Sequence, residues 1–307
     1  MNRKQHQMLI TLVVAVLVPA LNALVFVFGQ AGGATSGDWQ AVDQAIGRTG
    51  QAQADGAYKV AFPRSDLKVT VEGVDLKPAL ALGGWVAFSK PGSDSMLMGD
   101  LVLAEDEVPA VMASLESGGI QVTAVHNHVQ HESPRGMYMH IGGHGDAVKL
   151  ATAVKQAMAL TKIPPPTPPA AAPADIGIDT AGIEQALGYK GKVNGGVFQV
   201  GVPRAEAISE GGMKVPSSMG LSTALNFQPT GGGKAAITGD FVLIGTEVNP
   251  VIQALRGNGI NVTALHSHML DEQPKLFFMH FWANDDAVKL AKGLRAGLDK
   301  TNSQKSK

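Results

Sequence analysis

The chain contains two copies of one sequence, and this duplication restricts the folds that are open to it. Residues 99–161 align with residues 239–301 without a gap, at an offset of 140 positions. Upstream, "FPR" at 62–64 matches "VPR" at 202–204, with small insertions between the matched segments. Solenoid repeats have far shorter periods than this. The sequence therefore predicts two homologous domains in tandem.

A segment rich in proline and alanine separates the two copies. "IPPPTPPAAAP" has few side chains to bury, which is typical of an extended, semi-rigid spacer. We expect a first copy at 38–162, a linker at 163–174 and a second copy at 175–301. A chain of 307 residues has room for two domains of ordinary size.

Hydrophobic spacing indicates both helices and strands within each copy. In the first copy, apolar residues recur at helical spacing over about 106–117 and 146–160. Strand patterns cover 97–103, 120–128 and 136–142. This order predicts an α+β fold of two homologous domains, each a mainly antiparallel sheet covered by helices. Two such domains can pack on each other through a pseudo-two-fold axis.

The N-terminus has the layout of an export signal. "MNRK" carries positive charge, residues 8–28 carry no charge, and small residues follow. The apolar run of 21 residues is also long enough to span a bilayer. Residues 1–33 are therefore predicted to be a signal peptide or an N-terminal membrane anchor, with membrane attachment through 8–28 if the segment is not cleaved. The rest of the chain is then exported to the periplasm or cell envelope.

Composition excludes several other classes of protein. The chain has no cysteine, so disulfides, thiolate metal sites and a lipid-modified cysteine are impossible. The net charge of −1 gives no indication of nucleic-acid binding. With 45% hydrophobic and 17% charged residues, the chain has the composition of a globular protein.

The histidines show the most unusual pattern in the sequence. "VTAVHNH" (122–128) and "VTALHSH" (262–268) are equivalent segments, and a bend and a further histidine follow in "MYMHIG" (137–142) and "FFMHFW" (277–282). Six of the nine histidines thus form two matching sets of three. The sets are His126, His128 and His140 in the first copy, and His266, His268 and His280 in the second.

Strand geometry gives these sets a chemical meaning. His126 and His128 are two residues apart, so on a strand both point to one face. If the returning strand places His140 opposite His128, three imidazoles share that face at about 4.5–5.5 Å between partners. Three histidines with an open fourth position suit zinc, copper or iron. A register slip of one residue would turn His140 to the other face.

Two other uses of the histidines remain open on the same pattern. They could line a site for an organic ligand without metal, or they could be structural residues bonded to backbone carbonyls. The first copy also has His131 and His144, where the second has Asp271 and Asn284. If only one copy is functional, this difference favours the first.

Further polar residues recur in both copies and are candidates for the second shell of a metal or for ligand binding. Glu132 and Glu272, in the bends, could bind an ion or fix a histidine tautomer. Asp100 and Asp240, inside strand patterns, could approach the histidines or pair with arginines. Arg64 and Arg204 could bind a carboxylate or phosphate through two hydrogen bonds, or form structural ion pairs.

The segment "GIQVTAVHNHVQHESPRGMYMHIGGHGDAVKLA", with "GDLVL" before it, resembles the LppY/LpqO family of secreted bacterial proteins, which are built on a domain of unknown function. The resemblance is strongest over 99–160 and 239–300 and extends more weakly over nearly all of 38–162 and 175–300. It implies a bacterial envelope location and two tandem copies, and it implies no activity. Some members are lipoproteins, but this chain lacks the cysteine needed for a lipid anchor.

The sequence as a whole predicts an exported protein that binds a transition metal, or a ligand through a metal, at the histidine sets. Metal-assisted hydrolysis and redox chemistry are both compatible with this prediction, as is binding without catalysis. One alternative is a metal-free binding module that holds a ligand between the domains with the histidines and Arg64 or Arg204. Another is a structural envelope protein with no catalytic site.

Overall fold

The computed structural model describes residues 39–166 and 175–305. The expected signal peptide or anchor at 1–33 lies outside these ranges, as does most of the expected linker. Within the described ranges, no helix is both long enough and apolar enough to cross a membrane. The described residues of both repeats belong to a single unit by their internal contacts.

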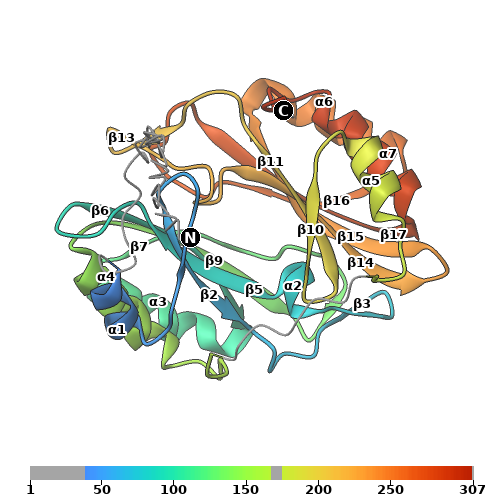
Figure 1. Ribbon diagram of the computed structural model, residues 1–307. Helices are drawn as coiled ribbons and strands as arrows, with labels where there is room; N and C mark the ends of the chain where they lie inside the picture. Colours follow the sequence, from blue (N-terminus) through green and yellow to red (C-terminus); the bar gives the residue numbers. More distant parts are fainter. Residues whose placement is uncertain (1–38, 167–174, 306–307) are drawn as a thin grey trace, which may run out of the picture. The chain divides into compact units, whose positions relative to one another are not determined.

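The elements of the first repeat follow the expected order, with short extra strands (Figure 1). They are α1 (Gln40–Ile46), β1 (Gln51–Ala52), β2 (Tyr58–Pro63), β3 (Thr70–Val71), β4 (Val74–Asp75), α2 (Pro78–Ala81), β5 (Gly83–Phe88), β6 (Ser95–Ala104), the 3-10 helix η1 (Glu105–Glu107), α3 (Val108–Ser117), β7 (Gln121–His126), β8 (Glu132–Ser133), β9 (Gly136–Gly145) and α4 (Ala147–Met158).

The second repeat has equivalents of these elements except α2, η1 and β8, which have no counterpart among its described residues. They are α5 (Thr180–Leu187), β10 (Gly191–Asn194), β11 (Val197–Pro203), β12 (Ser209–Glu210), β13 (Met213–Lys214), β14 (Ser222–Gly231), β15 (Lys234–Ile244), α6 (Gly245–Gly257), β16 (Asn261–His266), β17 (Leu276–Asp286) and α7 (Ala287–Leu298).

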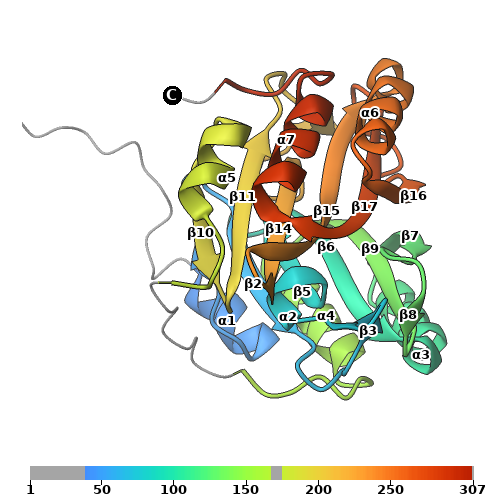
Figure 2. The same ribbon diagram turned by 90° about the vertical axis from the view of Figure 1, so that its right-hand side faces the viewer.

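Each repeat is built on a six-stranded antiparallel sheet. The strand orders are β1-β2-β5-β6-β9-β7 and β10-β11-β14-β15-β17-β16, so β7 and β16 are edge strands at equivalent positions. Helices α1, α3 and α4 pack on one face of the first sheet, and α5, α6 and α7 on one face of the second (Figure 2). The predicted α+β fold, with two homologous sheets covered by helices, is confirmed.

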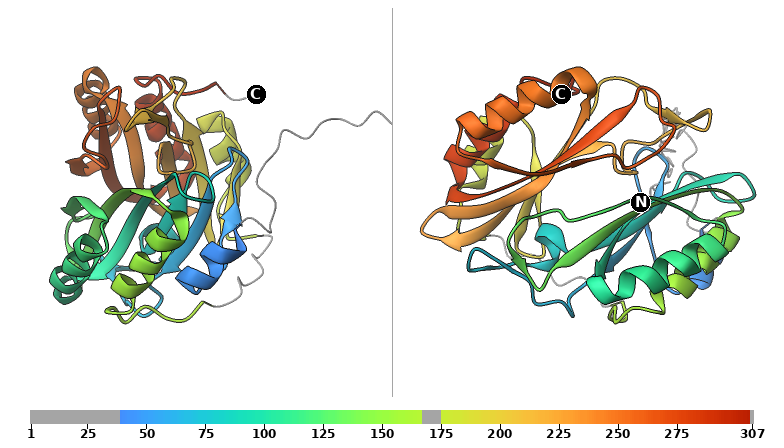
Figure 3. Two further views of the ribbon diagram at one scale, coloured as in Figure 1. Left: turned by 90° about the vertical axis from the view of Figure 1, so that its left-hand side faces the viewer. Right: turned by 180° about the vertical axis from the view of Figure 1, so that it is seen from behind.

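The alternation of side chains along β6 divides each repeat into two layers. Leu97 and Leu101 face the helices and belong to the core between the sheet and its helices. Met98 and Val102 face the opposite way, into clusters that contain residues of both repeats. The helix-free faces of the two sheets are therefore the faces through which the repeats contact each other, with helices on the outside (Figure 3).

Each repeat also lays an extended segment against the other repeat. The segment that contains β3, β4 and α2 packs against Ala236 and Trp282 of the second repeat. The Gln228 side chain fixes it by accepting from Lys77 N at 2.8 Å and donating to Asp75 O at 2.7 Å. The segment at 208–221 packs in turn against Met96 and Met98 of the first repeat. These reciprocal contacts bury the helix-free faces and enclose the residues between them.

Candidate metal centre

A β-bulge in each edge strand determines where the histidines point. In β7, Val122 pairs with Ile141 and the next pair is Ala124 with His140, so Thr123 is an extra residue. Val122 packs towards the helices. The extra residue reverses the alternation, so His126 points away from the helices and towards the second repeat. The same bulge occurs between Val262 and Ala264 in β16.

The register of the hairpin differs from the one predicted. His140 lies opposite Ala124 and not opposite His128, and His126 lies opposite Tyr138. Strand β7 ends at His126, because the chain leaves the sheet there to form the longer bend that contains β8. The difference is four residues, from His128 to Ala124, and a shift by an even number preserves the face on which a side chain lies. The histidines are therefore still brought together.

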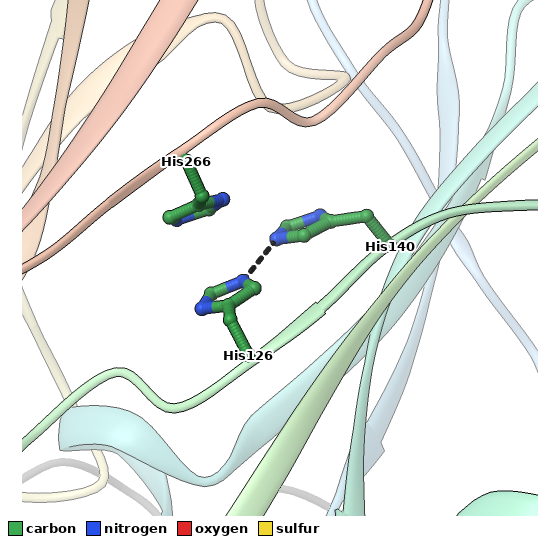
Figure 4. A group of neighbouring side chains, drawn as sticks. All are labelled: His126, His140 and His266. Atoms are coloured by element: carbon green, nitrogen blue, oxygen red, sulfur yellow. Dashed lines mark hydrogen bonds between the residues drawn. The ribbon is translucent and has the colours of Figure 1, made fainter.

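The two predicted sets of three histidines form one cluster, shared by the repeats. His126 stacks on His266 with 3.5 Å between ring centroids. His128 stacks on His280 at 3.8 Å, and His140 on His268 at 3.7 Å. His128 is equivalent to His268, and His280 is equivalent to His140. Exchange of the two repeats therefore turns the contact of His128 with His280 into that of His268 with His140. The site thus lies on the pseudo-two-fold axis. Figure 4 shows three of its members, His126, His140 and His266, with their rings close together.

Hydrogen bonds to backbone carbonyls fix the tautomers of three imidazoles. The Nδ1 atoms of His126, His266 and His280 lie 3.0, 3.3 and 2.6 Å from the carbonyl oxygens of Asn127, Ser267 and Gly239. A carbonyl oxygen only accepts, so Nδ1 carries the proton and Nε2 of the neutral ring has a free lone pair. This is the usual arrangement behind a histidine that binds metal through Nε2.

The Nε2 atoms of the cluster converge on one another. His126 Nε2 and His140 Nε2 are 3.0 Å apart (Figure 4). One nitrogen each of His126, His140 and His266 lie within 4.8 Å of one another. Ligand atoms of a tetrahedral ion at bonds of about 2.0–2.1 Å are about 3.3 Å apart. Small side-chain rotations would therefore bring these nitrogens to coordination geometry.

Burial keeps the imidazoles neutral. It lowers the pKa of His126, His266 and His280 to about 4. Burial and the neighbouring histidines lower the pKa of the other three members, His128, His140 and His268, well below the ordinary value. All six rings are consequently unprotonated near neutral pH, which is the state that binds a metal ion.

Several of these buried atoms have no hydrogen-bond partner in the described structure. They are Nε2 of His128, His266, His268 and His280, and Oδ1 of Asp100 and Asp240. Buried polar groups are normally satisfied, because an unpaired one costs about 1–3 kcal/mol. A concentration of unpaired polar atoms in one place is the condition that a bound cation would relieve, and for His266 and His280 the Nδ1–H hydrogen bonds make Nε2 an acceptor.

Asp100 and Asp240 complete the cluster on the strands next to the histidines. Asp100 pairs directly with His140 across β6 and β9, and its Oδ2 lies 3.8 Å from His128 Nε2. Asp240 Oδ2 lies 3.2 Å from His268 Nε2. Burial raises the pKa of both carboxyl groups, and for Asp100 the negative charge of Asp240 adds to the effect. The acids thus approach the histidines and do not pair with the arginines.

The sequence reasoning missed the residues that support the cluster. Thr123 Oγ1 donates to His268 O at 2.5 Å, and Thr263 Oγ1 donates to His128 O at 2.6 Å. Tyr138 stacks on His128, with ring centroids 3.3 Å apart. Both threonines belong to the "VTA" that precedes the histidines in each copy. This shared motif could have indicated that they support the histidines.

The structure does not bring Glu132 or Glu272 to the histidines. Glu132 accepts from Asn127 Nδ2 at 3.3 Å, and burial raises its pKa to about 7. Glu272 is fully buried and accepts from Leu276 N at 2.9 Å and Lys275 Nζ at 3.2 Å. In the described residues no hydrogen bond joins either carboxylate to a cluster histidine, so both shape the bends.

Arg64 and Arg204 form structural ion pairs. Arg64 is 1% exposed and contacts Glu107 Oε2 at 2.6 Å, Asp66 Oδ2 at 2.8 Å and Val102 O at 3.0 Å. Arg204 contacts Glu247 Oε2 at 2.7 Å in the same way. Every guanidinium nitrogen of the two arginines except the buried Arg204 Nε is hydrogen-bonded within the protein, which argues against the alternative in which they hold a ligand between the domains.

The residues that made the first copy richer in histidine lie outside the cluster. His131 and His144 are both exposed, and His144 Nε2 lies 2.7 Å from Glu210 Oε2 of the second repeat. Met139 and Met279 are fully buried between sheet and helices. Because the cluster uses equivalent residues of both repeats, there is no basis for preferring the first copy.

Fold and site together define a tandem-repeat α+β protein with a histidine–aspartate cluster between its repeats. The chain belongs to the DUF1529 family, described as "Domain of Unknown Function (DUF1259)", whose model matches residues 40–160 and again residues 181–300. No protein with a curated description matches the chain significantly.

Two solved structures show a weak likeness. The trimeric bacterial microcompartment shell protein PduB is 13% identical, with 82% of this chain and 89% of that chain covered and a TM-score of 0.22. EtuB from Clostridium kluyveri is 10% identical, with 81% and 90% covered and a TM-score of 0.19. Scores this low support no conclusion about fold or function.

Proposed function

We propose that the protein binds a transition-metal ion at the cluster of six histidines, Asp100 and Asp240. The observation that supports this most directly is the set of four buried Nε2 atoms that have no partner. Three backbone carbonyls already fix ring tautomers that leave Nε2 free. A metal-free structural role would leave these acceptors unpaired at a cost for each.

The donor set restricts the ion. Imidazole nitrogen suits zinc, copper and iron, and the chain has no thiolate to offer. Groups that combine an aspartate with two histidines are present in each repeat, namely Asp100, His128, His140 and Asp240, His266, His268. Two histidines and a carboxylate form a recurrent ligand set for zinc and for iron. Once bound, such an ion can polarise a ligand or activate water.

Metal binding is tested by reconstitution of the tag-free protein with zinc, copper, iron or manganese, one at a time, followed by elemental mass spectrometry. We expect stoichiometric retention of at least one of these ions and its loss in His126→Ala/His266→Ala. The matched control is His131→Asp/His144→Asn, which removes two histidines outside the cluster and introduces the second copy's residues. The proposal fails if wild type retains no more metal than His126→Ala/His266→Ala.

We also propose that the protein is exported and is related to the LppY/LpqO family. The support is the N-terminal charge and hydrophobicity pattern and the shared motif around the histidines. Cell fractionation with N-terminal sequencing tests the location. A periplasmic protein that begins near residue 33 agrees with cleavage, and a membrane-bound protein with the original N-terminus agrees with an anchor. A protein confined to the cytoplasm would contradict export.

A further inference from the structure

A cleft of about 420 Å³ opens on one side of the histidine cluster. His128, His268 and His280 line it, together with Asp100 and Asp240. Its remaining walls come from both repeats and include Lys59 and Trp85 of the first and Asn226 and Ser218 of the second. A small molecule in this cleft would therefore contact the proposed metal ligands directly.

Lys59 supplies a cation to the wall of this cleft. It lies on β2, and its Nζ is 3.8 Å from the centroid of the Trp85 ring and 3.4 Å from Ser218 O. Within the described residues, no carboxylate oxygen lies within 4.0 Å of its ammonium group. Burial lowers the pKa of Lys59 to about 8, opposed by the attraction of Asp100, so the group is still mainly charged at neutral pH. A partly buried cation without a partner anion has capacity to bind one.

The two repeats differ at this point of an otherwise symmetric site. Lys59 pairs with Ala87 in the sheet, and the equivalent pair in the second repeat is Gln199 with Asn226. Trp85 lies opposite Asp100, and Ala224 takes the same place opposite Asp240. The second repeat thus has an amide where the first has an ammonium, and a methyl where the first has an indole. The Gln199 amide donates to Ala79 O at 2.8 Å.

We propose that the cleft binds a small organic anion, with its negative group beside Lys59 and its body against Trp85. The inference rests on the proposed function in one respect, because Asp100 and Asp240 oppose an anion until a cation offsets their charge. A divalent ion at the cluster would offset the charge of both carboxylates, so anion binding is expected to be tighter in metal-loaded protein. The site then holds metal and anion side by side.

The experiment uses the full chain, loaded with zinc or metal-free, titrated calorimetrically with benzoate, succinate or inorganic phosphate. Benzamide is the neutral analogue of benzoate. We expect zinc-loaded protein to bind benzoate or succinate, and binding of phosphate alone would contradict an organic ligand. Benzamide should bind at least about tenfold more weakly than benzoate, because it lacks the charge for one charge-assisted hydrogen bond. The Lys59→Gln variant, which carries the second repeat's residue, should lose about tenfold in anion affinity.

The control is Lys90→Gln, which removes an exposed lysine that pairs with Asp94 outside the cleft. It should leave anion affinity unchanged, and both lysine variants should retain the zinc content of wild type. Equal anion binding in wild type and Lys59→Gln overturns the inference, as does the absence of binding for all three anions up to about 10 mM. If no metal binds but Lys59-dependent anion binding remains, the cleft stands and the metal proposal fails.

Discussion

The imidazoles of His126 and His266 stack on each other with ring centroids 3.5 Å apart, although 140 residues separate them in the chain. They are equivalent residues on the edge strands of two homologous sheets. The contacts of His128 with His280 and of His140 with His268 flank this pair. The duplication has therefore produced one site with contributions from both repeats.

The threonine in each bulge should stabilise this shared site. Thr123→Val keeps the shape of the side chain but removes the hydrogen bond to His268 O. We expect a loss of about 1 kcal/mol in the free energy of unfolding and a several-fold loss of metal affinity. Urea denaturation and a competitive zinc titration measure these effects. The control, Thr152→Val, removes an exposed hydrogen bond within α4. Equal effects of the two substitutions would contradict the account.

The buried pair between Arg204 and Glu247 should contribute strongly to stability. Burial tends to raise the pKa of Glu247, but hydrogen bonds from Arg204 and from the N–H groups of Ile244 and Asn302 outweigh burial and lower it. Its stabilisation is therefore complete above its ordinary pKa of 4.5 and is lost as pH falls through the lowered folded-state value. At neutral pH, Glu247→Gln should cost about 2–3 kcal/mol, because among the described residues the buried Arg204 then keeps just the partly exposed Glu206 as a carboxylate partner.

The Arg204 pair is tested by urea denaturation of Glu247→Gln beside Asp94→Asn. Asp94 forms an exposed pair with Lys90, so its replacement should leave the urea midpoint nearly unchanged, as is usual for surface ion pairs. If Glu247→Gln is no more costly than this control, the buried pair does not stabilise the fold.

The glycine before Asp240 should tolerate no side chain. A Cβ on Gly239 would lie 1.8 Å from Ala224 O, which is backbone of the neighbouring strand. Gly239→Ala must displace β14 or β15, so we expect a loss of about 3 kcal/mol or more and weaker metal binding. Gly201→Ala is the matched control, because a Cβ there meets no atom within 4 Å. Thermal melts that coincide for the two variants would rule out this close packing.

As the pH is lowered, the metal-free protein should begin to lose stability at a higher pH than protonation of its carboxylates alone would produce. The pKa of His280 falls from an ordinary value of 6.5 to about 4 in the folded state. A lowered histidine pKa means that the unfolded chain binds protons first. Stability is therefore constant above about pH 7, falls as pH drops from 6.5 towards 4, and falls no further from this cause below 4.

Urea midpoints of chelator-treated protein between pH 7.5 and 4.5 measure this histidine effect. His126→Asn/His266→Asn should show a shallower decline than wild type, because it removes two histidines whose pKa burial lowers to about 4. Identical slopes for the two proteins would contradict the lowering of these pKa values.

Much of the fold followed from the sequence because its signals are local. Hydrophobic periodicity located β6 (Ser95–Ala104), α4 (Ala147–Met158) and their equivalents, and the duplication identified two similar sheets. In the structure His126 and His128 both reach the cluster, although β7 ends at His126 and His128 lies beyond the strand. The spacing of these two histidines thus indicated their proximity. It could not reveal to which face of the sheet His126 points, because that depends on the bulge at Thr123, a single extra residue whose pairing is set by β9.

The sequence suggested that the two copies pack on each other, but it could not predict which residues meet between them. Nothing in the local pattern shows that His126 meets His266, because that contact depends on how two complete sheets pack. For the same reason Lys59 and Trp85 were not recognised, although they lie in a cleft with the histidines. The repeated arginines were candidates for ligand binding, but the structure gives them a structural role. Arg64 pairs with the buried Glu107, and Arg204 pairs with the buried Glu247.

The most direct test of the central claim is the metal content per chain of wild type, His126→Ala/His128→Ala and His266→Ala/His268→Ala, measured together by elemental mass spectrometry after reconstitution. A site shared by the repeats predicts that either double variant loses nearly all of the metal that wild type retains. Retention of about half of the metal by each variant would show two independent sites. Absence of metal from wild type with zinc, copper, iron and manganese would contradict the account altogether.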